Sequence, residues 1–343
     1  MNKTPLKIAF TLCSNNYLSQ ALVLGNSLLR TNPDYKFHIG VVDERNDRIN
    51  YETFSDFQFT FVEQIGLPQF DDLIARYNII ELNTSVKSSY FKYLFQRYPN
   101  CSHIHYFDPD IKLLHSLDKL DSYFGNYNIL LTPHILQPIT DDSLEPRENM
   151  FLNYGIYNLG YLGLKNDEES FRLLDWWENH TLGLGYMDVK NGYFVDQLWM
   201  NHVPLFFDGV KILREKGFNC APWNLQERAI LDANDELIVL DDKSILTFYH
   251  FSSFNPNQPE RLSHSYNRNT FTQHPSFWAI YDTYRQELLQ AGYNNYNKLS
   301  CGFIHKKELK KEPNKFHILP LIKRIGYLLL PPILTNIFKR FIF

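Results

Sequence analysis

The sequence lacks the usual signs of a secreted or disulfide-rich protein. Its four cysteines stand far apart and form no Cys-x-x-Cys pair, so neither a disulfide framework nor a cysteine-based zinc site is indicated. The N-terminal segment MNKTPLKIAF has no extended apolar stretch and no small-residue cleavage site, which argues against a secretory signal. We therefore expect a protein of the reducing cytoplasm.

Phosphate-binding loops rich in glycine are also missing. The segment TLCSNNYL follows the first expected strand and contains no glycine, whereas a sugar nucleotidyltransferase should have a glycine-rich loop there. The chain contains neither the GxxxxGK[ST] sequence of P-loop enzymes nor the GxSxG turn of serine hydrolases. A nucleotidyltransferase is kept only as a lesser alternative.

Apolar residues are plentiful, at 44% of 343 residues, which is enough for the core of one large domain or two small ones. The net charge is −4, but the last 38 residues hold nine basic and two acidic side chains, so this tail carries +7 and the body −11. An acidic body argues against a nucleic-acid partner. A basic tail favours contact with an anionic membrane surface.

The tail contains an uncharged run of 14 residues, Ile325 to Phe338, which two prolines interrupt. Because a membrane-spanning helix needs about 20 apolar residues, we expect this run to lie on a bilayer and not to cross it. The alternative is a helix packed on the body or on another subunit.

Strands and helices are expected to alternate along the chain, which predicts a mostly parallel sheet. Apolar segments predict strands at residues 6–12, 37–42, from 59 onward and 103–107, a strand pair at 153–164 and a late strand at 245–251. Helical spacing predicts helices after a Ser14 or Asn15 cap, over 84–98 with a Thr84 cap, and over 168–179 and 192–201.

Two aspartates, Asp108 and Asp110, directly follow the strand at 103–107. On an extended turn their carboxylates lie within reach of one divalent ion, and such oxygen ligands suit Mg²⁺ or Mn²⁺. The spacing alone is weak, because about one such pair is expected by chance in a chain of this composition. Asp43 ends another strand, at the edge where α/β folds bind ligands.

Three blocks, LCSNNYLSQALVLGNSLL, SVKSSYFKYLF and HIHYFDPDIKLL, together resemble the opening of GT-A glycosyltransferases close to glycosyltransferase family 8. The blocks NLGYLGL and GYFVDQLWMN extend the resemblance, and FNCAPWNLQER and FYHFSSFNPNQPERLSHSYNR resemble segments of related bacterial cell-surface glycosyltransferases. The resemblance covers about residues 5–268. It implies a GT-A fold, an Mn²⁺ or Mg²⁺ cofactor, a nucleotide-sugar donor (a UDP-sugar) and a glycan or glycolipid acceptor.

The resemblance and the basic tail together predict the organisation of the chain. A GT-A catalytic domain is expected over 1–270, a helical extension over 271–305 and a membrane-surface anchor over 306–343, so that the enzyme would sit on the inner face of the cell membrane. A noncatalytic carbohydrate-binding or scaffold protein on a degenerate fold is the alternative function.

Individual roles follow from the matching positions. The resemblance implies that His250 joins Asp108 and Asp110 as a metal ligand, that Asp196 and Gln197 are catalytic residues beside the anomeric carbon, and that the reaction is retaining. After His250 the chain departs from the family, because Ser252 and the three residues that follow replace its usual Gly, Lys and Trp. The residues expected to contact the donor are Thr11, Leu12, Tyr17, Asp43, Lys87, Asp108, Asn158, Gly160 and Ser252.

Structural explanations are the alternatives for several of these residues. Lys87 would then lie on a solvated helix face, Tyr17 in the core, and Asp196 at a helix N-terminus. An inverting reaction would need a base, for which the first candidates are Asp141, Asp142 and Glu145. Trp223 and Asn224 are expected at the acceptor pocket, and the histidines His103, His105 and His264 are expected to be structural.

Overall fold

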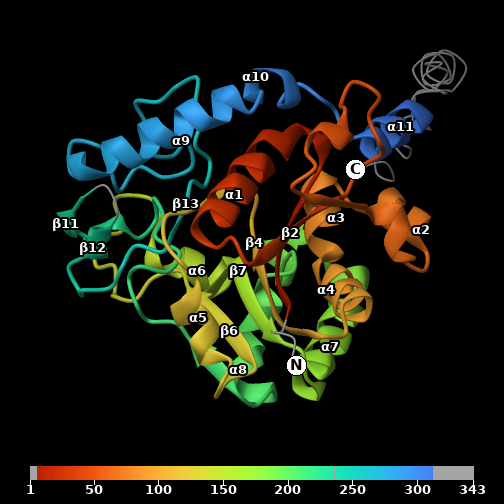
Figure 1. Cartoon of the computed structure of the whole chain (residues 1–343), viewed down its shortest axis with the longest axis horizontal. Helices are drawn as coiled ribbons and strands as arrows, with labels where there is room; N and C mark the ends of the chain where they lie inside the picture. Colours follow the sequence, from red (N-terminus) through yellow and green to blue (C-terminus); the bar gives the residue numbers. More distant parts are fainter. Residues whose placement is uncertain (1–5, 235–236, 312–343) are drawn as a thin grey trace, which may run out of the picture. The chain divides into compact units, whose positions relative to one another are not determined.

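The computed structural model describes residues 6–234 and 237–311, and the chain divides into two compact units, residues 1–304 and 305–343 (Figure 1). The membrane-surface anchor expected at the C-terminus lies outside the described residues from residue 312 onward. Among the helices described here, none has both the length and the apolar character needed to cross a bilayer. The domain boundaries expected at residues 270 and 305 stay predictions.

A seven-stranded sheet forms the centre of the first unit. β7 runs antiparallel to both of its neighbours, and the other neighbouring strands are parallel. This confirms the prediction of an α/β fold with a mostly parallel central sheet. In spatial order the strands are β10 (Val210–Ile212), β6 (Ile129–Pro133), β7 (Tyr157–Lys165), β4 (Cys101–Phe107), β1 (Leu6–Cys13), β2 (Tyr35–Val41) and β3 (Gln58–Phe61).

Helices cover both faces of this sheet, and the alternation of side chains along β1 shows how. Ile8, Phe10 and Leu12 point to one face and join a core cluster with residues of α4 (Lys87–Arg97) and α7 (Glu168–Leu184). Ala9 and Cys13 point to the other face, where α1 (Leu18–Thr31) packs. Because both faces are buried, β1 reads as an almost continuous apolar run.

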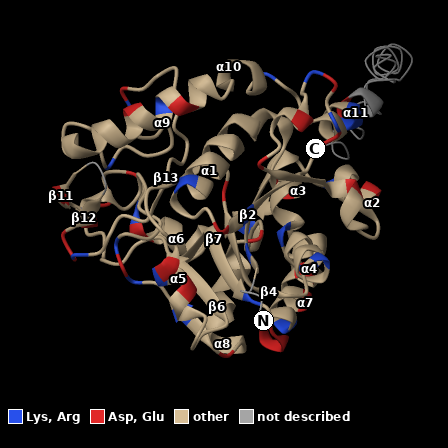
Figure 2. Ribbon diagram, viewed as in Figure 1, with Lys and Arg blue, Asp and Glu red and all other residues tan. Residues whose placement is uncertain are grey.

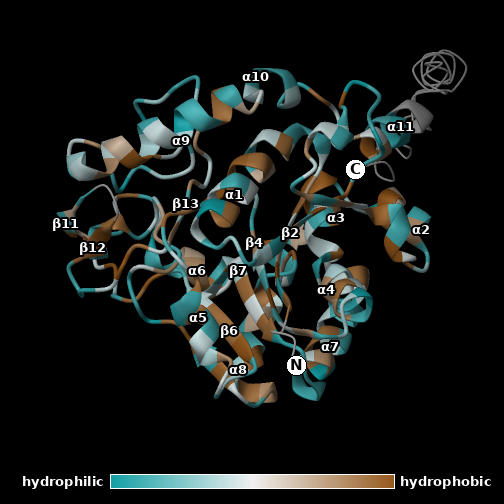
Figure 3. Cartoon of the chain, in the orientation of Figure 1, coloured by the Kyte–Doolittle hydropathy of each residue, from teal (hydrophilic) through white to brown (hydrophobic). Residues whose placement is uncertain are grey.

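The charged residues lie mainly on helices and loops (Figure 2). Figure 3 shows hydrophobic residues along the central strands and on α1. The further helices are α2 (Phe70–Arg76), α3 (Ile79–Ser85), α5 (Asp118–Tyr123), α6 (Glu148–Tyr154), α8 (Val203–Phe206), α9 (Trp278–Gln290), α10 (Tyr293–Tyr296) and α11 (Gly302–Lys311). The further strands are β5 (Ile111–Leu113), β8 (Met187–Asp188), β9 (Tyr193–Phe194), β11 (Ile230–Ala233), β12 (Ile238–Leu240) and β13 (Phe248–His250).

Three local predictions were wrong. The helix expected over 84–98 is two helices, α3 and α4, which meet at Val86; Asn78 caps α3 by accepting from the N–H groups of Ile80 and Glu81, so Thr84 is not a cap. Instead of a strand pair at 153–164, α6 ends at Tyr154 and the single strand β7 follows.

The helix expected over 192–201 is also absent. A short strand, β9, ends at Phe194, and a 3₁₀ helix begins at Leu198. Between them Val195 has a φ of 42°, a left-handed conformation that costs a β-branched residue energy and breaks the helical pattern. Local helical periodicity is overridden here by the buried contacts of Asp196 described below.

Two glycines give opposite expectations for the same substitution. At Gly25 in α1 an added Cβ would lie 2.7 Å from Phe57 and 2.8 Å from Phe37, so Gly25→Ala should lower the free energy of unfolding by about 1–3 kcal/mol despite the better helix propensity of alanine. At Gly183 in α7 nothing lies within 4 Å, so Gly183→Ala should raise stability by about 0.5–1 kcal/mol. Urea unfolding measures both, and equal effects would contradict the packing of α1 on the sheet.

Candidate functional site

A group of polar residues gathers at the carboxyl end of β4, where the chain turns into β5. The N–H of Asp108 donates to the carbonyl of Gly160 on β7 at 2.8 Å, which holds the turn against the sheet. β5 pairs antiparallel with β13, with His250 opposite Ile111. This pairing brings His250 to Asp110, with 3.1 Å between Nε2 and Oδ1.

Asp108, Asp110 and His250 offer ligand atoms that all lie within 4.8 Å of one another. The side chains of Asp108 and Asp110 are 31% and 20% exposed, whereas the His250 side chain is 5% exposed. The carboxylates therefore open toward solvent above a buried imidazole. Burial opposes the charged imidazolium, but the nearby Asp110 outweighs it and raises the pKa of His250.

Gly160 explains how the His250 ring can lie so close to β7. A Cβ at position 160 would lie 2.5 Å from Cε1 and 2.6 Å from Nδ1 of His250. Any side chain there would displace the ring. The close approach thus requires glycine at this position.

Lys87, the first residue of α4, is buried beside the aspartates. Its Nζ lies 2.7 Å from Oδ2 of Asp196 and 3.9 Å from Oδ1 of Asp108, and it donates to the carbonyl of Leu159 at 3.1 Å. It also lies 4.2 Å from the centre of the Tyr106 ring. With a side chain only 2% exposed, Lys87 does not lie on a solvated helix face.

Asp196 is held in place from both its backbone and its side chain. The strained Val195 precedes it, and Nε1 of Trp177 donates to its carbonyl at 3.0 Å. Burial raises the pKa of Asp196, and the neighbouring Lys87 counteracts part of this rise. Asp196 is not in a regular helix, so the explanation as a helix N-terminal charge does not apply.

Asn158 and Gln197 belong to a buried hydrogen-bond network behind the carboxylates. Oε1 of Gln197 accepts from the N–H of Leu159 at 2.9 Å, and its Nε2 donates to the carbonyl of Tyr154 at 2.7 Å. Oδ1 of Asn158 accepts from the Asn219 amide at 2.9 Å and from the N–H of Gly160 at 3.1 Å. These bonds fix the backbone of β7 beside the site.

The donor-side residues are less closely grouped. Thr11 and Leu12 are buried within β1, whereas Tyr17 is 42% exposed. Loss of hydration and the charges of Asp110 and Asp108 raise the pKa of Tyr17 to about 12, so its hydroxyl lies near the carboxylates. Ser252, two residues after His250, is half-buried.

Asp43 is engaged by the protein backbone. Its carboxylate accepts from the N–H groups of Asn15 at 3.1 Å, Glu44 at 2.8 Å and Gly302 at 2.7 Å. Burial raises the pKa of Asp43, while these bonds oppose the rise. The carboxylate therefore ties the end of β2 to the start of α11.

Trp223 and Asn224, expected at the acceptor pocket, are buried next to the site. Both donate to the carbonyl of His134, at 2.9 and 3.0 Å. The Trp223 ring stands edge-on to His250 with 5.1 Å between ring centres. Trp223 therefore packs against His250, and Asn224 helps to fix the backbone at His134.

Two tyrosines near the carboxylates were missed from the sequence. The Tyr106 hydroxyl donates to Oδ1 of Asp108 at 2.6 Å, and its spacing two residues before Asp108 on a strand could have indicated this. The Tyr284 hydroxyl is buried without a hydrogen-bond partner among the described residues. Burial and the nearby Asp110 raise its pKa, but its distance along the chain gave no signal.

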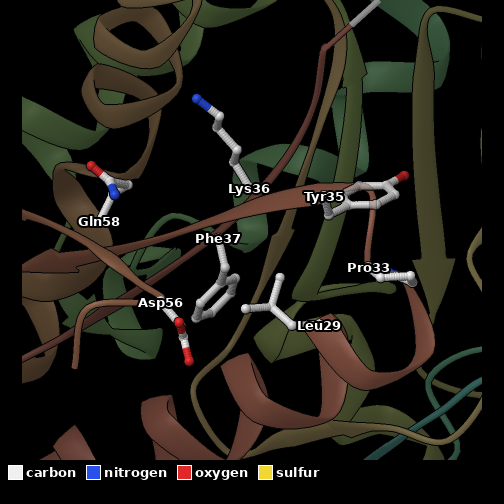
Figure 4. Close-up of a pocket in the computed structure, with 7 residues that line it drawn as sticks. All are labelled: Leu29, Pro33, Tyr35, Lys36, Phe37, Asp56 and Gln58. Carbon is white, nitrogen blue, oxygen red and sulfur yellow. The ribbon is translucent and has the colours of Figure 1, made fainter. Parts of the chain in front are cut away.

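A pocket elsewhere in the first unit lies near the amino ends of the strands, whereas Asp108 and Asp110 follow the carboxyl end of β4. It measures about 360 Å³ and is lined by Leu29, Pro33, Tyr35, Lys36, Phe37, Asp56 and Gln58, near the starts of β2 and β3 (Figure 4). Because these strands run parallel to β4, the pocket is remote from Asp108 and Asp110.

Comparison with known proteins gives distant relatives. No family model matches the chain. It is 32% identical to the uncharacterized protein YfnF of Bacillus subtilis over 100 residues, which are 29% of this chain and 33% of that protein. It is 21% identical to the uncharacterized protein YfnD of the same organism over 255 residues, which are 71% of this chain and 76% of YfnD. The chain thus spans about a third of the length of YfnF in that match.

The solved structures that the chain resembles include glycosyltransferases. One is galactosyltransferase LgtC in complex with donor and acceptor sugar analogues, with a TM-score of 0.48, 16% identity, and coverage of 88% of this chain and 100% of that chain. Another is the glycosyltransferase GlyE of Streptococcus pneumoniae TIGR4, with a TM-score of 0.45, 17% identity, and coverage of 84% of this chain and 64% of that chain.

The buried ion pair predicts a pH-dependent loss of stability when Lys87 is replaced. Lys87→Met should lower the free energy of unfolding by about 3–5 kcal/mol at neutral pH, because Asp196 would remain as an unpaired buried carboxylate. Without Lys87 the pKa of Asp196 lies still further above its unfolded value of about 4. The folded variant then binds the proton more tightly than the unfolded chain, so the loss should be smaller at pH 5 than at pH 8.

Urea unfolding at the two pH values measures this effect. Lys87→Met combined with Asp196→Leu should regain most of the lost stability, since neither charge remains. Lys92→Met is the matched control on the same helix, because Lys92 pairs with Asp175 and Glu178 nearer the surface and should cost about 1 kcal/mol or less. A double variant as unstable as Lys87→Met would show that the pair is not the cause.

Proposed function

We propose that this chain is a metal-dependent glycosyltransferase that moves a sugar from a nucleotide-sugar, a UDP-sugar, to a cell-surface glycan or glycolipid acceptor with retention of configuration. The observation that carries the proposal is the convergence of Asp108, Asp110 and His250 next to the buried Lys87–Asp196 pair. The resemblance of the sequence blocks to family 8 supports the same assignment.

The charges around the turn after β4 fit a divalent cation. Lys87 pairs with Asp108 and Asp196, and Asp110 pairs with His250, so among these described residues the three carboxylates outnumber the one ammonium group. Two carboxylates and an imidazole form a donor set that suits Mn²⁺ and also accommodates Mg²⁺. Asp108, Asp110 and His250 would hold the ion, and when bound it would neutralise the diphosphate of the leaving nucleotide.

The protein's own residues supply the rest of the proposed chemistry. Lys87 holds the Asp196 carboxylate and contributes positive charge beside Asp108. Asp196 is proposed as the catalytic carboxylate, which would stabilise positive charge at the anomeric carbon in an oxocarbenium-like transition state. Gln197 is proposed to act by positioning, because its amide already binds Leu159 and Tyr154.

Donor and acceptor contacts complete the proposal. Gly160 and Asn158 of β7 are proposed to contact the donor sugar, and Tyr17 and Thr11 to contact its nucleotide. Ser252, in the segment that replaces the family's usual Gly, Lys and Trp, is proposed to offer a hydroxyl to the diphosphate. We also propose that the basic tail places the enzyme on an anionic membrane surface, where a lipid-linked acceptor would be found.

Gly160, which lies against the His250 ring, gives a test of the metal site in which none of the three ligand residues is substituted. Gly160→Ala should weaken Mn²⁺ binding about 10- to 100-fold, because the new Cβ displaces the His250 ring. Isothermal titration calorimetry measures the affinity. If the ring is the cause, adding Gly160→Ala to His250→Ala should produce little further loss. Unchanged Mn²⁺ affinity in Gly160→Ala would remove His250 from the ligand set.

Donor specificity tests the proposed activity directly. The full chain is incubated with UDP-, GDP-, CMP- and dTDP-sugars, with and without Mn²⁺, while nucleotide release and thermal shift are measured. We expect Mn²⁺-dependent hydrolysis of one UDP-sugar and a fall of at least about 100-fold in Asp110→Asn, since a ligand of the charge-neutralising ion is lost.

The matched control is Asp118→Asn, an exposed aspartate of α5, which should behave as wild type. Full activity in Asp110→Asn would refute the metal assignment. A folded protein that binds a sugar nucleotide but never turns it over, even with acceptor extracts, would favour the noncatalytic carbohydrate-binding alternative.

A further inference from the structure

A second group of metal-ligand side chains lies toward the opposite end of β4. His103 and His105 alternate along β4 and so face the same side of the sheet, where α5 presents Asp121. One ligand atom from each of these residues lies within 4.8 Å of the others. Tyr35 reaches the same place from β2, because Lys7 on β1 stands opposite Tyr35 on one side and His103 on the other.

The distances within this group match a tetrahedral zinc site. Oδ1 of Asp121 lies 3.1 Å from Nε2 of His103 and 3.0 Å from Nε2 of His105, and the Tyr35 hydroxyl lies 3.3 Å from Nε2 of His103. Zinc bonds of about 2.0–2.1 Å give ligand-to-ligand edges of about 3.3 Å. The two distances to the imidazoles are shorter than this edge by about 0.3 Å or less, and the 2.5 Å contact from Tyr35 to Asp121 is shorter by about 0.8 Å, so the hydroxyl would have to retreat by that amount.

Outer hydrogen bonds hold both imidazoles in the ligand orientation. Nδ1 of His103 lies 2.9 Å from the Ser102 hydroxyl, and Nδ1 of His105 lies 2.9 Å from the Tyr161 hydroxyl. Each Nε2 is thereby left to face Oδ1 of Asp121, and histidines in metal sites are fixed in the same way through the other ring nitrogen.

The charges and exposure of the group fit a structural ion. Oδ2 of Asp121 binds Lys7 at 2.9 Å, and Lys7 also binds Asp34, so the two carboxylates outnumber the ammonium group. The His105 side chain is fully buried and that of Asp121 is 13% exposed. Four protein ligands leave no open position for a substrate, which is the arrangement of structural zinc sites.

We propose that His103, His105, Asp121 and the Tyr35 hydroxyl form a structural zinc site that joins β2, β4 and α5. It is separate from the Asp108 group, which lies beyond the carboxyl end of β4, and it does not depend on the proposed function. Two imidazoles favour zinc over the Mg²⁺ or Mn²⁺ expected at the carboxylate-rich site. The sequence predicts that His103 and His105 are structural, and in this proposal their structural role is to bind zinc.

Metal content of the full chain tests the proposal. Protein purified from zinc-supplemented cells and passed over a desalting column should carry about one zinc per chain by plasma mass spectrometry. Asp121→Asn and His103→Gln should each lower this content about tenfold or more. Asp118→Asn on the same helix, and Asp108→Asn combined with Asp110→Asn, should keep the zinc.

Spectroscopy and stability give readouts that need no variant. Wild-type protein stripped by a chelator and loaded with Co²⁺ should show the visible absorption of a tetrahedral ion, and chelator alone should lower the melting temperature by about 5 °C or more. Zinc far below one per chain after loading, or a melting temperature unchanged by chelator, would show that Asp121 instead joins the histidines through hydrogen bonds alone. Zinc that disappears with the Asp108 and Asp110 substitutions would place it at the other site and overturn the proposal.

Discussion

The buried contact between Lys87 and Asp196 is the interaction on which the rest of the site depends. Neither charge is stable in this interior without the other. The pairing therefore holds the start of α4 next to the segment that follows β9. Lys87 also binds the carbonyl of Leu159, which ties the pair to β7. The pair therefore joins the start of α4, the segment after β9 and β7 beside the carboxyl end of β4, where Asp108 and Asp110 emerge. The strain at Val195 is tolerated because this pairing, with the Trp177 bond, holds Asp196 in place.

Much of the architecture could be predicted from the sequence because its signals are local. The apolar run of β1, the Asp-x-Asp turn after β4 and the long periodic helix α7 each depend on neighbours in the chain, and each was found within a few residues of its observed place. The group of Asp108, Asp110 and His250 was also anticipated, but only because several sequence blocks together resemble a known family. No rule of spacing links position 250 to position 110; the antiparallel pairing of β5 with β13 does so.

What the sequence could not provide depends on contacts between distant segments. A helix was expected over 192–201 from its periodicity, whereas a buried charge and a tryptophan bond impose an irregular turn. Lys87 could be read as a solvated residue, because nothing near it in the sequence shows that the side chain is buried. Gln197 and Asn158 stood out as polar residues in matching blocks, yet their amide groups form hydrogen bonds within the protein. Only the three-dimensional network distinguishes a polar side chain that holds the backbone from one that contacts a ligand.

The hydrogen bond from Gly302 to Asp43 joins residues 259 positions apart, and it affects how the molecule is completed during its synthesis. The strands β1, β2 and β4 can pair as soon as the first third of the chain has left the ribosome, because domains fold from the N-terminus as they emerge. At that stage the Asp43 carboxylate, at the end of β2, has only two of its three backbone N–H donors, because Gly302 has not yet been synthesised. This edge of the sheet reaches its final form only after nearly nine-tenths of the chain has been translated, so a nascent chain exposes an unfinished edge for most of its time on the ribosome.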